Sequence, residues 1–361
     1  MAAGEQQLNV VPTDGTNTCS EPVPDAAPPK RGRHRRLRWI AISAALLLLV
    51  VIGGAAGTFY YFVHAVDSRV GRVQAFDQIP ARDRPQKAAV AADAMNFLIL
   101  GSDSRDLENT TGSRSDTIIL LHIDKDHTGA DLVSIPRDTW VHIPKSPAGP
   151  YGNTDAKINA AYAWGGVPLT VQTVEKFTGV YIDHVVLIDF AGFKEIIDKL
   201  GGVEINVEKS FTSTHSLNAN SIRHFNAGPQ LLDGAAALDY ARERYAFADG
   251  DFARIRHQQQ LINAVLDRAT SGGLPTNPAK LHAFLEACAA SIVVDSTLNI
   301  RNTAWELRHL GSADLHFYTN PSSGIGRVGS QSVVFPDRAR AKDAFDAIRL
   351  DRPLPASIPA N

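Results

Sequence analysis

The sequence predicts an α/β domain built on a single mixed β-sheet flanked by helices, preceded by one N-terminal transmembrane helix. Three observations predict this class. An uncharged apolar stretch fills residues 39–63, and a strand–helix–strand pattern covers 181–207. Short β-rich apolar runs, each bounded by Gly, Asp, Ser or Pro, occur at 97–100, 117–122 and 131–135.

The apolar stretch at 39–63 is long enough to span a bilayer, because at ~1.5 Å per residue it exceeds the ~30 Å hydrocarbon core. Trp39, Tyr60 and Tyr61 suit the two membrane interfaces. Six Lys or Arg fall within residues 30–38. The positive-inside rule then predicts a single-pass protein of the cell membrane, with a cytoplasmic N-terminus and an extracytoplasmic domain. A cleaved signal peptide is the alternative, although the apolar run is too long for an ordinary one.

The net charge of −2 gives no global basic field, so we expect no nucleic-acid partner. Cys19 and Cys288 fall on opposite sides of the predicted span and cannot pair within one chain. No CxxC or HExxH spacing occurs, which argues against zinc. The expected segments are a disordered cytoplasmic tail at 1–38, the span at 39–63, a stem at 64–92, the extracytoplasmic domain at 93–350 and a tail at 351–361.

The three β-rich runs predict an antiparallel meander, since KDHTG at 125–129 is a good hairpin turn between the second and third. An up-down-up path brings Asp103, Asp116 and Arg137 to one edge of the sheet. Next come a strand at 181–189, a helix at 189–200 ending at a Gly-Gly pair, and a strand at 203–207. We expect further helices at about 257–268, 279–290 and 338–349, and strands at 315–318 and 332–335.

Two carboxylates, in GSDSR and RSDT, follow or begin predicted strands. Asp103 and Asp116 suit Mg²⁺, which proteins hold with one or two carboxylates plus substrate phosphate. The alternative is that each only caps a turn. Arg105 and Arg137 lie in the same strand-end segments, and spaced guanidiniums suit phosphate oxygens. Asp138 is placed to orient the Arg137 guanidinium, although a surface salt bridge is the simpler interpretation.

Further basic residues follow along the chain. In ARER, Arg242 and Arg244 would point the same way on an extended segment and diverge on a helix. A solvated charge run is the alternative there. KINAAYAWGG supplies Lys157 and Asn159 as a second pair of phosphate donors.

The segment after Gly250 predicts a helix with a polar trio bordering its buried face. Asp251, Arg254 and Gln258 fall within about 60° on a helical wheel, close to an N-terminus that favours anions. An apolar stripe at Phe252, Ile255, Ile262 and Leu266 anchors the helix. A plain amphipathic helix is the alternative. On the same wheel Arg256 and His257 point away from the site, and we expect both to be solvated.

At these residues the chain resembles the LytR-CpsA-Psr family of cell-wall ligases. The resemblance covers roughly 93–270 and extends plausibly to about 350. One departure is that the family often has RQQ where this chain has His257-Gln258-Gln259. The matching stretches, in family order, are GSDSR, RSDTIIL, SIPRD, KINAAYAWGG, IDHVVLIDFAGFKEIIDKLGGV, LDGAAALDYARER and GDFARIRHQQ.

The resemblance implies an extracytoplasmic phosphotransferase that uses Mg²⁺ or Mn²⁺. Its partners would be a polyprenyl-pyrophosphate-linked anionic glycopolymer, peptidoglycan and the membrane. Transfer of the polymer to a peptidoglycan hydroxyl would release polyprenyl phosphate. By motif position it implies metal binding by Asp103 and Asp116; catalytic roles for these two with Arg137, Arg242 and Arg244; pyrophosphate binding by Arg105, Arg137, Lys157, Arg242, Arg244, Arg254 and Gln258; and support from Asp138, Asn159 and Asp251.

The lipid tail of such a donor needs a long apolar slot, and we expect the helix at 189–200 and the sheet beneath it to form its wall. Two rival functions remain open from the sequence. One is a non-catalytic module that binds polyprenyl phosphate, and the other is a hydrolase that transfers the same phosphoryl group to water.

Overall fold

The computed structural model describes residues 68–102, 115–146, 149–213, 222–271 and 277–358. The chain divides into two compact units, Met1–Thr58 and Phe59–Asn361, and every described residue belongs to the second. The predicted span at 39–63 and the tail before it lie outside the described residues. Within the described ranges, no helix has both the length and the hydropathy needed to cross a membrane.

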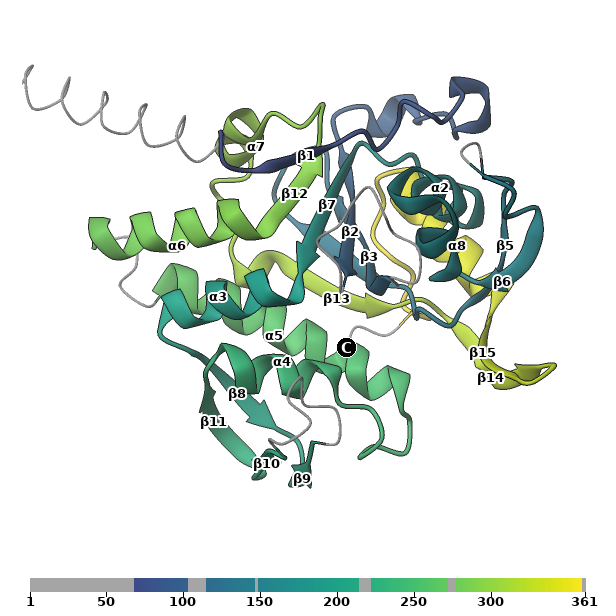
Figure 1. The fold of residues 1–361 in the computed structure, drawn as a ribbon. Helices are drawn as coiled ribbons and strands as arrows, with labels where there is room; N and C mark the ends of the chain where they lie inside the picture. Colours follow the sequence, from purple (N-terminus) through teal and green to yellow (C-terminus); the bar gives the residue numbers. More distant parts are fainter. Residues whose placement is uncertain (1–67, 103–114, 147–148, 214–221, 272–276, 359–361) are drawn as a thin grey trace, which may run out of the picture. The chain divides into compact units, whose positions relative to one another are not determined.

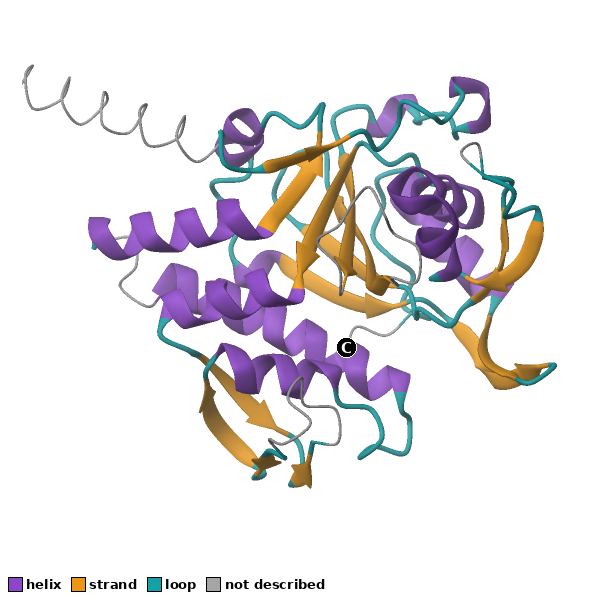
Figure 2. Ribbon diagram, viewed as in Figure 1, coloured by secondary structure: helices purple, strands orange, loops and turns teal. Residues whose placement is uncertain are grey.

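In the described residues, a seven-stranded mixed sheet forms the centre of the domain, as predicted (Figures 1 and 2). Its order is β1-β12-β7-β2-β3-β4-β13, with β2 antiparallel to β3 and parallel to β7. The strands are β1 (Gly71–Val73), β2 (Met95–Ser102), β3 (Ser115–Ile123), β4 (Ala130–Ser134), β7 (His184–Asp189), β12 (Ile292–Asp295) and β13 (Leu315–Thr319).

The predicted meander is confirmed. Strand β3 is antiparallel to both β2 and β4, and the KDHTG turn closes with Asp124 accepting hydrogen bonds from the backbone and hydroxyl of Thr128. Gly101 pairs with Thr117 near the site end of β2, where an added Cβ would lie 2.8 Å from the Thr117 Cβ. This close approach requires glycine at that position.

Helices cover both faces of the sheet (Figure 1). Helices α2 and α8 pack on one face around Leu98, Leu120 and Phe345, and α3, α4 and α5 lie on the other. Helix α2 is interrupted at Gly165 and Gly166, just before its internal proline. The helices are α2 (Ala160–Thr178), α3 (Phe190–Leu200), α4 (Gly234–Arg242), α5 (Asp251–Ser271), α6 (Pro278–Ser291), α7 (Ile300–Glu306) and α8 (Arg338–Arg349), with short 3₁₀ turns at Ala81–Asp83, Ala89–Ala91 and Ser312–Asp314.

The predicted strand–helix–strand order over 181–207 is confirmed, but its second strand does not join the central sheet. Strand β7 and helix α3 form as expected, but β8 (Val203–Val207) pairs with β11 (Gly228–Leu232) in a separate two-stranded sheet. In β8 the residues alternate, with Val203, Ile205 and Val207 buried and those between them exposed. That alternation suits a strand with one wet face, whereas a central parallel strand is apolar on both faces.

Three further ribbons stand apart from the central sheet in the described residues. They pair β5 (Trp140–Ile143) with β6 (Thr154–Lys157), β9 (Phe211–Thr212) with β10 (His224–Phe225), and β14 (Ser322–Val328) with β15 (Gln331–Pro336).

Segments expected to flank the domain contribute to it where they are described. Strand β1, within the expected stem, pairs in parallel with β12, and Ala75 and Ile79 enter the main core. Near the other end, Asp351 contacts His122, and Ile358 is buried. The packed domain therefore includes residues on both sides of 93–350.

Candidate functional site

The edge formed by the end of β2, the start of β3 and the segment after β4 brings predicted site residues together. The Arg137 guanidinium donates to the Asp116 carboxylate, and the two form an ion pair. The predicted convergence is therefore confirmed for this pair. Asp103 and Arg105 lie outside the described residues.

Asp138 contacts a different cation from the one expected. It forms an ion pair of 3.1 Å with Lys157, while Arg137 turns to Asp116. The reason lies in the β5–β6 ribbon, which carries Lys157 at its end and brings it back beside Asp138. Buried Asn159 donates its backbone N–H to the carbonyl of Arg137 at 3.2 Å. Lys157 therefore lies beside Asp138, and Asn159 beside Arg137 through its backbone N–H; their role as phosphate donors stays a prediction.

The acid partners of Arg137 determine its titration. Burial acts to lower the pKa of the guanidinium, but the charge and hydrogen bond of Asp116 oppose it. Asp138 and Asp251 add to that opposition, and the pKa of Arg137 is raised. The guanidinium is therefore charged at neutral pH.

The start of α5 contributes a buried ion pair. Asp251 and Arg254 lie 2.6 Å apart, and their side chains are 9% and 5% exposed. Burial raises the pKa of Asp251, and the charges of Arg254, Arg137 and Arg244 only partly counteract it. Burial also lowers the pKa of Arg254, against the attraction of Asp251. Since these groups act on one another electrostatically, they form a single cluster.

The two arginines of ARER separate where α4 ends. Arg242 is the last residue of the helix, and Glu243 after it is extended. The Glu243 carboxylate accepts hydrogen bonds from the backbone N–H groups of Arg244, Tyr245 and Ala246, which shapes the turn. The Arg244 guanidinium lies 4.6 Å from the Tyr245 ring and contributes to the charge around Asp251.

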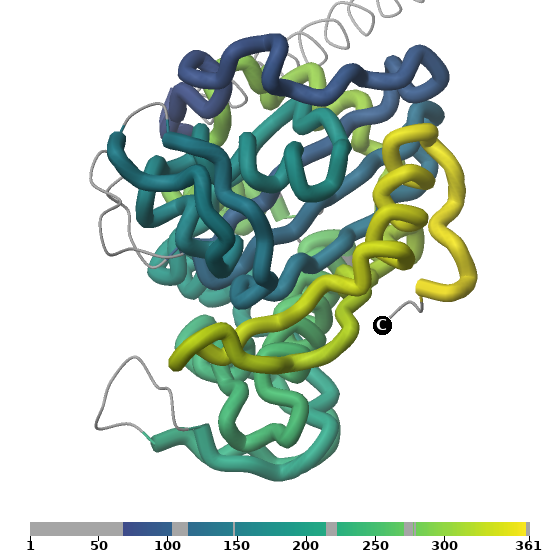
Figure 3. The backbone as a smooth tube through the Cα atoms, turned by 90° about the vertical axis from the view of Figure 1, so that its right-hand side faces the viewer, coloured from purple at the N-terminus to yellow at the C-terminus, as the bar shows by residue number. Residues whose placement is uncertain are grey.

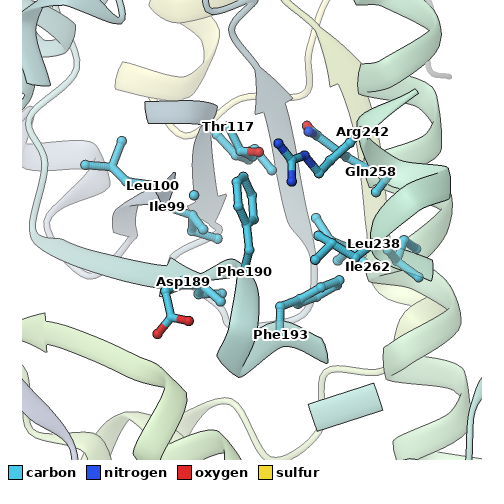
Figure 4. A pocket seen from close by; sticks show the side chains of 15 residues that line it. Ile99, Leu100, Thr117, Asp189, Phe190, Phe193, Leu238, Arg242, Gln258 and Ile262 are labelled. Atoms are coloured by element: carbon cyan, nitrogen blue, oxygen red, sulfur yellow. The ribbon is translucent and has the colours of Figure 1, made fainter. Parts of the chain in front are cut away.

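Arg242 lies instead in an apolar slot between the sheet and helices α3, α4 and α5. Its guanidinium stands 4.9 Å from the Phe190 ring, and Figure 4 shows it directed toward Thr117 and Phe190. The expected wall at 189–200 is present through Phe190 and Phe193. The slot has a volume of about 90 Å³ and is lined by Ile99, Leu100, Gly101, Thr117, Ile119, Ile188, Asp189, Phe190, Phe193, Leu238, Ala241, Arg242, Gln258, Leu261 and Ile262.

Several polar atoms of this region are buried without a hydrogen-bond partner among the described residues. They include Nε of Arg137, Nη1 of Arg242 and Nε of Arg254. Buried donors in folded proteins are normally satisfied, so each such atom needs an explanation. Of these three donors, that of Arg242 lines the slot, and those of Arg137 and Arg254 belong to the ion-paired cluster around Asp116 and Asp251. The carboxylate oxygens of Asp251 also lack a hydrogen bond among the described residues. Unsatisfied guanidinium donors suit an anionic ligand.

The expectation that His257 is solvated was wrong. The residue is 1% exposed, and its ring centroid lies 4.2 Å from that of Tyr240 and 4.7 Å from that of Phe247. Phe211 stacks on it at 6.3 Å. Burial lowers the pKa of His257 to about 4, against the attraction of Glu208. Helix α5 is covered on two sides, because the lobe of β8, β9, β10 and β11 packs on a second face of it, next to the slot.

The sequence interpretation missed Thr117 as part of the site, and it predicted a wall at 189–200 without assigning Phe190 to it. Thr117 directly follows Asp116 in RSDT, and Phe190 opens helix α3 after the N-cap Asp189. Each of these two residues directly follows an aspartate of a motif, and that neighbourhood could have indicated it. Neither side chain carries a charge or a metal-binding group that would have marked it as part of a site. Gln258 lies beside Arg242 in the slot, as its place in the polar trio predicted.

The described donor set fits a divalent cation only in part. Asp116 offers hard carboxylate oxygens at the edge of the cluster, with its side chain 20% exposed. Its expected partner Asp103 lies outside the described residues. Among the residues that the structure does describe, no group of three His, Cys, Asp or Glu side chains could hold a metal. One described carboxylate, already paired with Arg137, does not by itself define a Mg²⁺ site, and the metal stays a prediction.

The fold and the site define an α/β protein that holds an arginine-rich cluster and an apolar slot. The chain belongs to the LytR_cpsA_psr family, whose family model matches residues 63–347.

Curated relatives and a solved structure agree with this assignment. The chain is 35% identical over 197 residues to Polyisoprenyl-teichoic acid--peptidoglycan teichoic acid transferase TagV of Bacillus subtilis (strain 168), covering 55% of this chain and 48% of TagV. It is 33% identical over 300 residues to Probable cell wall biosynthesis protein LcpB of Corynebacterium glutamicum, covering 78% of this chain and 66% of LcpB. The crystal structure of B. subtilis TagV aligns with a TM-score of 0.60 at 29% identity, covering 72% of this chain and 98% of that one. The chain thus matches about half the length of curated TagV.

Proposed function

We propose that this protein is a phosphotransferase that moves an anionic glycopolymer from a polyprenyl-diphosphate carrier to a hydroxyl of peptidoglycan. The relative TagV carries a name for transfer of this kind. The proposal is also supported by the site itself, which joins an apolar slot to a cluster of guanidinium groups.

The observation that carries the proposal is the position of Arg242. Its side chain lies within the apolar slot, and its buried Nη1 has no hydrogen-bond partner among the described residues. A cation within an otherwise apolar slot matches a molecule with an anionic head and a hydrocarbon tail. A water-soluble phosphate would gain nothing from Phe190, Phe193 and Leu238 in the slot.

In this reaction the protein acts by positioning and by neutralising charge. Phosphoryl transfer develops negative charge on the departing phosphate, and preorganised donors are worth most in a water-poor site. Arg242 binds that phosphate at the slot, and Arg137 and Arg254 stabilise its charge from the cluster. Asp116 holds Arg137 in place, and Asp251 does the same for Arg254. A Mg²⁺ held by Asp116 and Asp103 would supply Lewis-acid chemistry when bound.

The same proposal places the domain outside the cell membrane, anchored by the apolar stretch at 39–63. A polyprenyl-diphosphate donor resides in the bilayer, so an anchored enzyme meets its substrate at the membrane surface. A membrane-flotation assay of the full chain and of a version without residues 1–63 tests this part. We expect the first to float with membranes and the second to stay in solution.

One incubation separates the proposed function from its rivals. The purified full chain is mixed with a polyprenyl-diphosphate-linked glycan, Mg²⁺ and peptidoglycan oligomers, and the products are resolved by mass. Glycan covalently attached to peptidoglycan supports the transferase. Free phosphorylated glycan alone makes the protein a hydrolase, and binding without turnover makes it a lipid-phosphate binding module.

A further inference from the structure

A second cavity, of about 450 Å³, lies on the side of the domain formed by α2, β5 and α8. Figure 3 faces this side, with α8 in yellow and α2 in teal. We call it the basic groove. Its lining residues are Trp140, Val141, His142, Lys176, Phe177, Thr178, Gly179, Pro336, Arg338, Ala341, Lys342, Asp346 and Arg349.

Positive charge dominates the basic groove. Four exposed cations, Lys176, Arg338, Lys342 and Arg349, line it against the single carboxylate Asp346. Asp346 forms ion pairs with Lys342 and Arg349, the latter at 3.0 Å. Lys176 and Arg338 have no ion-pair partner anywhere in the described part of the chain. Four cations against one carboxylate leave an excess of three positive charges, two of them on Lys176 and Arg338.

The β5–β6 ribbon connects residues that line the groove to residues of the site. Trp140 pairs with Lys157 and His142 with Asp155, and residues directly opposite in a ladder share one face. Trp140 therefore lies on the same face as Lys157, which forms the ion pair with Asp138 in the site. One face of the ribbon leads from the cluster to the groove.

Strand β15 makes a second connection. The backbone N–H of Val334 donates to the carbonyl of Asp138 at 2.9 Å, and Thr139 forms a β-bridge with Val334. Two residues further along β15, Pro336 lines the groove, and Arg338 opens α8 there. On both β5 and β15, residues that line the groove therefore lie within a few residues of a contact with Asp138 or Thr139.

We propose that the basic groove binds the anionic glycopolymer chain of the donor, beyond its diphosphate. This inference rests on the proposed function and names its substrate class, a polymer with repeated phosphate or carboxylate groups. A repeating anion can meet several separate cations at once, whereas a neutral glycan gains nothing from them. Trp140 adds a flat apolar surface against which a sugar ring can pack.

The test uses a double charge reversal of the two cations without ion-pair partners, Lys176→Glu with Arg338→Glu. Both side chains are exposed and neither belongs to the catalytic cluster, so the fold and the chemistry stay intact. The matched control reverses two exposed lysines on other helices, Lys199→Glu with Lys280→Glu. Both full-length variants and the unaltered chain are purified in neutral detergent and compared by thermal melting.

Binding is measured first, with a fluorescent glycerol-phosphate oligomer that carries no lipid and no diphosphate. We expect the unaltered chain and the control variant to bind it, more weakly as salt is added, and the groove variant to bind ~10-fold more weakly or worse. A neutral dextran oligomer should bind to none of them. Failure of the unaltered chain to bind the anionic oligomer, or equal binding by the groove variant, overturns the proposal.

Turnover is measured second, with two donors on the same polyprenyl diphosphate, one bearing a single sugar and the other an anionic polymer. The groove variant should lose kcat/KM by ~10-fold on the polymer donor and keep it on the short donor. Equal losses on both donors would overturn the proposal, because they indicate damage to the catalytic cluster. If the unaltered chain turns over neither donor, the proposed function fails, and the oligomer measurement alone decides on the groove.

A lipid headgroup carries similar anionic chemistry and must be distinguished from a polymer. Nanodiscs of phosphatidylglycerol and of phosphatidylcholine, each holding the full chain, separate the two sources. If the charge reversal alters behaviour in phosphatidylglycerol while leaving oligomer binding unchanged, the groove is a membrane contact and the proposal falls. Unchanged behaviour in both lipids, with loss of oligomer binding, supports the polymer.

Discussion

Buried polar side chains gather at both ends of strands β3 and β4, and the two clusters differ in how their bonds are satisfied. At the end away from the slot, His122 contacts Asn96 at 2.8 Å and Asp351 at 3.2 Å. Asn96 also donates to the Tyr181 carbonyl and to the carboxylate of Asp183. At the slot end, the guanidinium groups keep buried donors without partners among the described residues.

Whether the buried polar groups have partners within the chain indicates which cluster stabilises the fold and which is available to bind a ligand. A buried polar group that is fully paired within the chain stabilises the structure, whereas one left unsatisfied costs about 1–3 kcal/mol. Arg137, Arg242 and Arg254 carry that cost together in one place. A ligand with several acceptor oxygens would satisfy these donors, so we expect its binding to offset their cost.

The largest effect is expected from removing a guanidinium at the slot end. Arg242→Leu keeps an apolar side chain in the slot and removes the charge, and we expect kcat/KM for glycopolymer transfer to fall ~10²–10³-fold. The melting temperature should stay the same or rise, because a buried unsatisfied donor disappears with the guanidinium. Turnover and thermal melting of the same preparation measure both quantities.

The matched control for this variant is Arg82→Leu, at a side chain that is 86% exposed. It should leave both turnover and melting unchanged. A drop of many degrees in the melting temperature of Arg242→Leu would instead assign Arg242 to the structural class and remove the contrast between the two ends.

Much of the site could be predicted from the sequence because the relevant contacts are local or follow from strand pairing. The KDHTG turn and three short β-rich runs were enough to bring Asp116 and Arg137 to one edge of the sheet. Asp251, Arg254 and Gln258 followed from helical periodicity within one turn of α5 and the next. These relations depend only on residues close in sequence or joined by a tight turn.

The rest depended on contacts between distant segments. Phe211, Tyr240 and Phe247 come from a strand, a helix and a loop, and together they enclose His257. A helical wheel drawn for α5 alone has no information about a lobe that covers its second face. Asp138 was assigned to Arg137 because the two are adjacent, but Lys157 reaches it through the β5–β6 ribbon.

His257 is a third case for the comparison of buried polar groups. Both of its ring nitrogens are buried without a hydrogen bond among the described residues, but aromatic rings surround it. In the folded chain the pKa of His257 is lowered to about 4, whereas in the unfolded chain it is near 6.5. Between these two pH values the unfolded chain binds a proton at this residue and the folded chain does not. Stability is therefore lost as the pH falls through this window. This group accounts for about 3 kcal/mol of the loss.

His257→Phe should remove that pH dependence while keeping a ring of similar size in the aromatic enclosure. Denaturant unfolding at pH 7 and at pH 4.5 gives the difference between variant and unaltered chain at each pH. We expect the difference to shift in favour of the variant at the lower pH, and His309→Phe, at an exposed histidine, to show no such shift. Parallel stability curves for His257→Phe and the unaltered chain would show that this ring is not kept neutral by burial.

The smallest expected effect tests the paired end. Asp351 has φ of 51° and accepts contacts from His122 and from the backbone and side chain of Lys125. Asparagine tolerates this left-handed backbone well, so Asp351→Asn removes the charge without adding strain. We expect the free energy of unfolding to fall by about 1–3 kcal/mol, because buried partners lose a charged acceptor. Turnover should stay unchanged, since this end of β3 is remote from the slot.

Asp343→Asn, at an exposed position of α8, is the control that should change neither the free energy of unfolding nor turnover. If Asp351→Asn lost turnover while its free energy of unfolding stayed unchanged, the cluster around His122 would also serve the reaction. A complete set of hydrogen bonds would then no longer distinguish a structural cluster from a functional one.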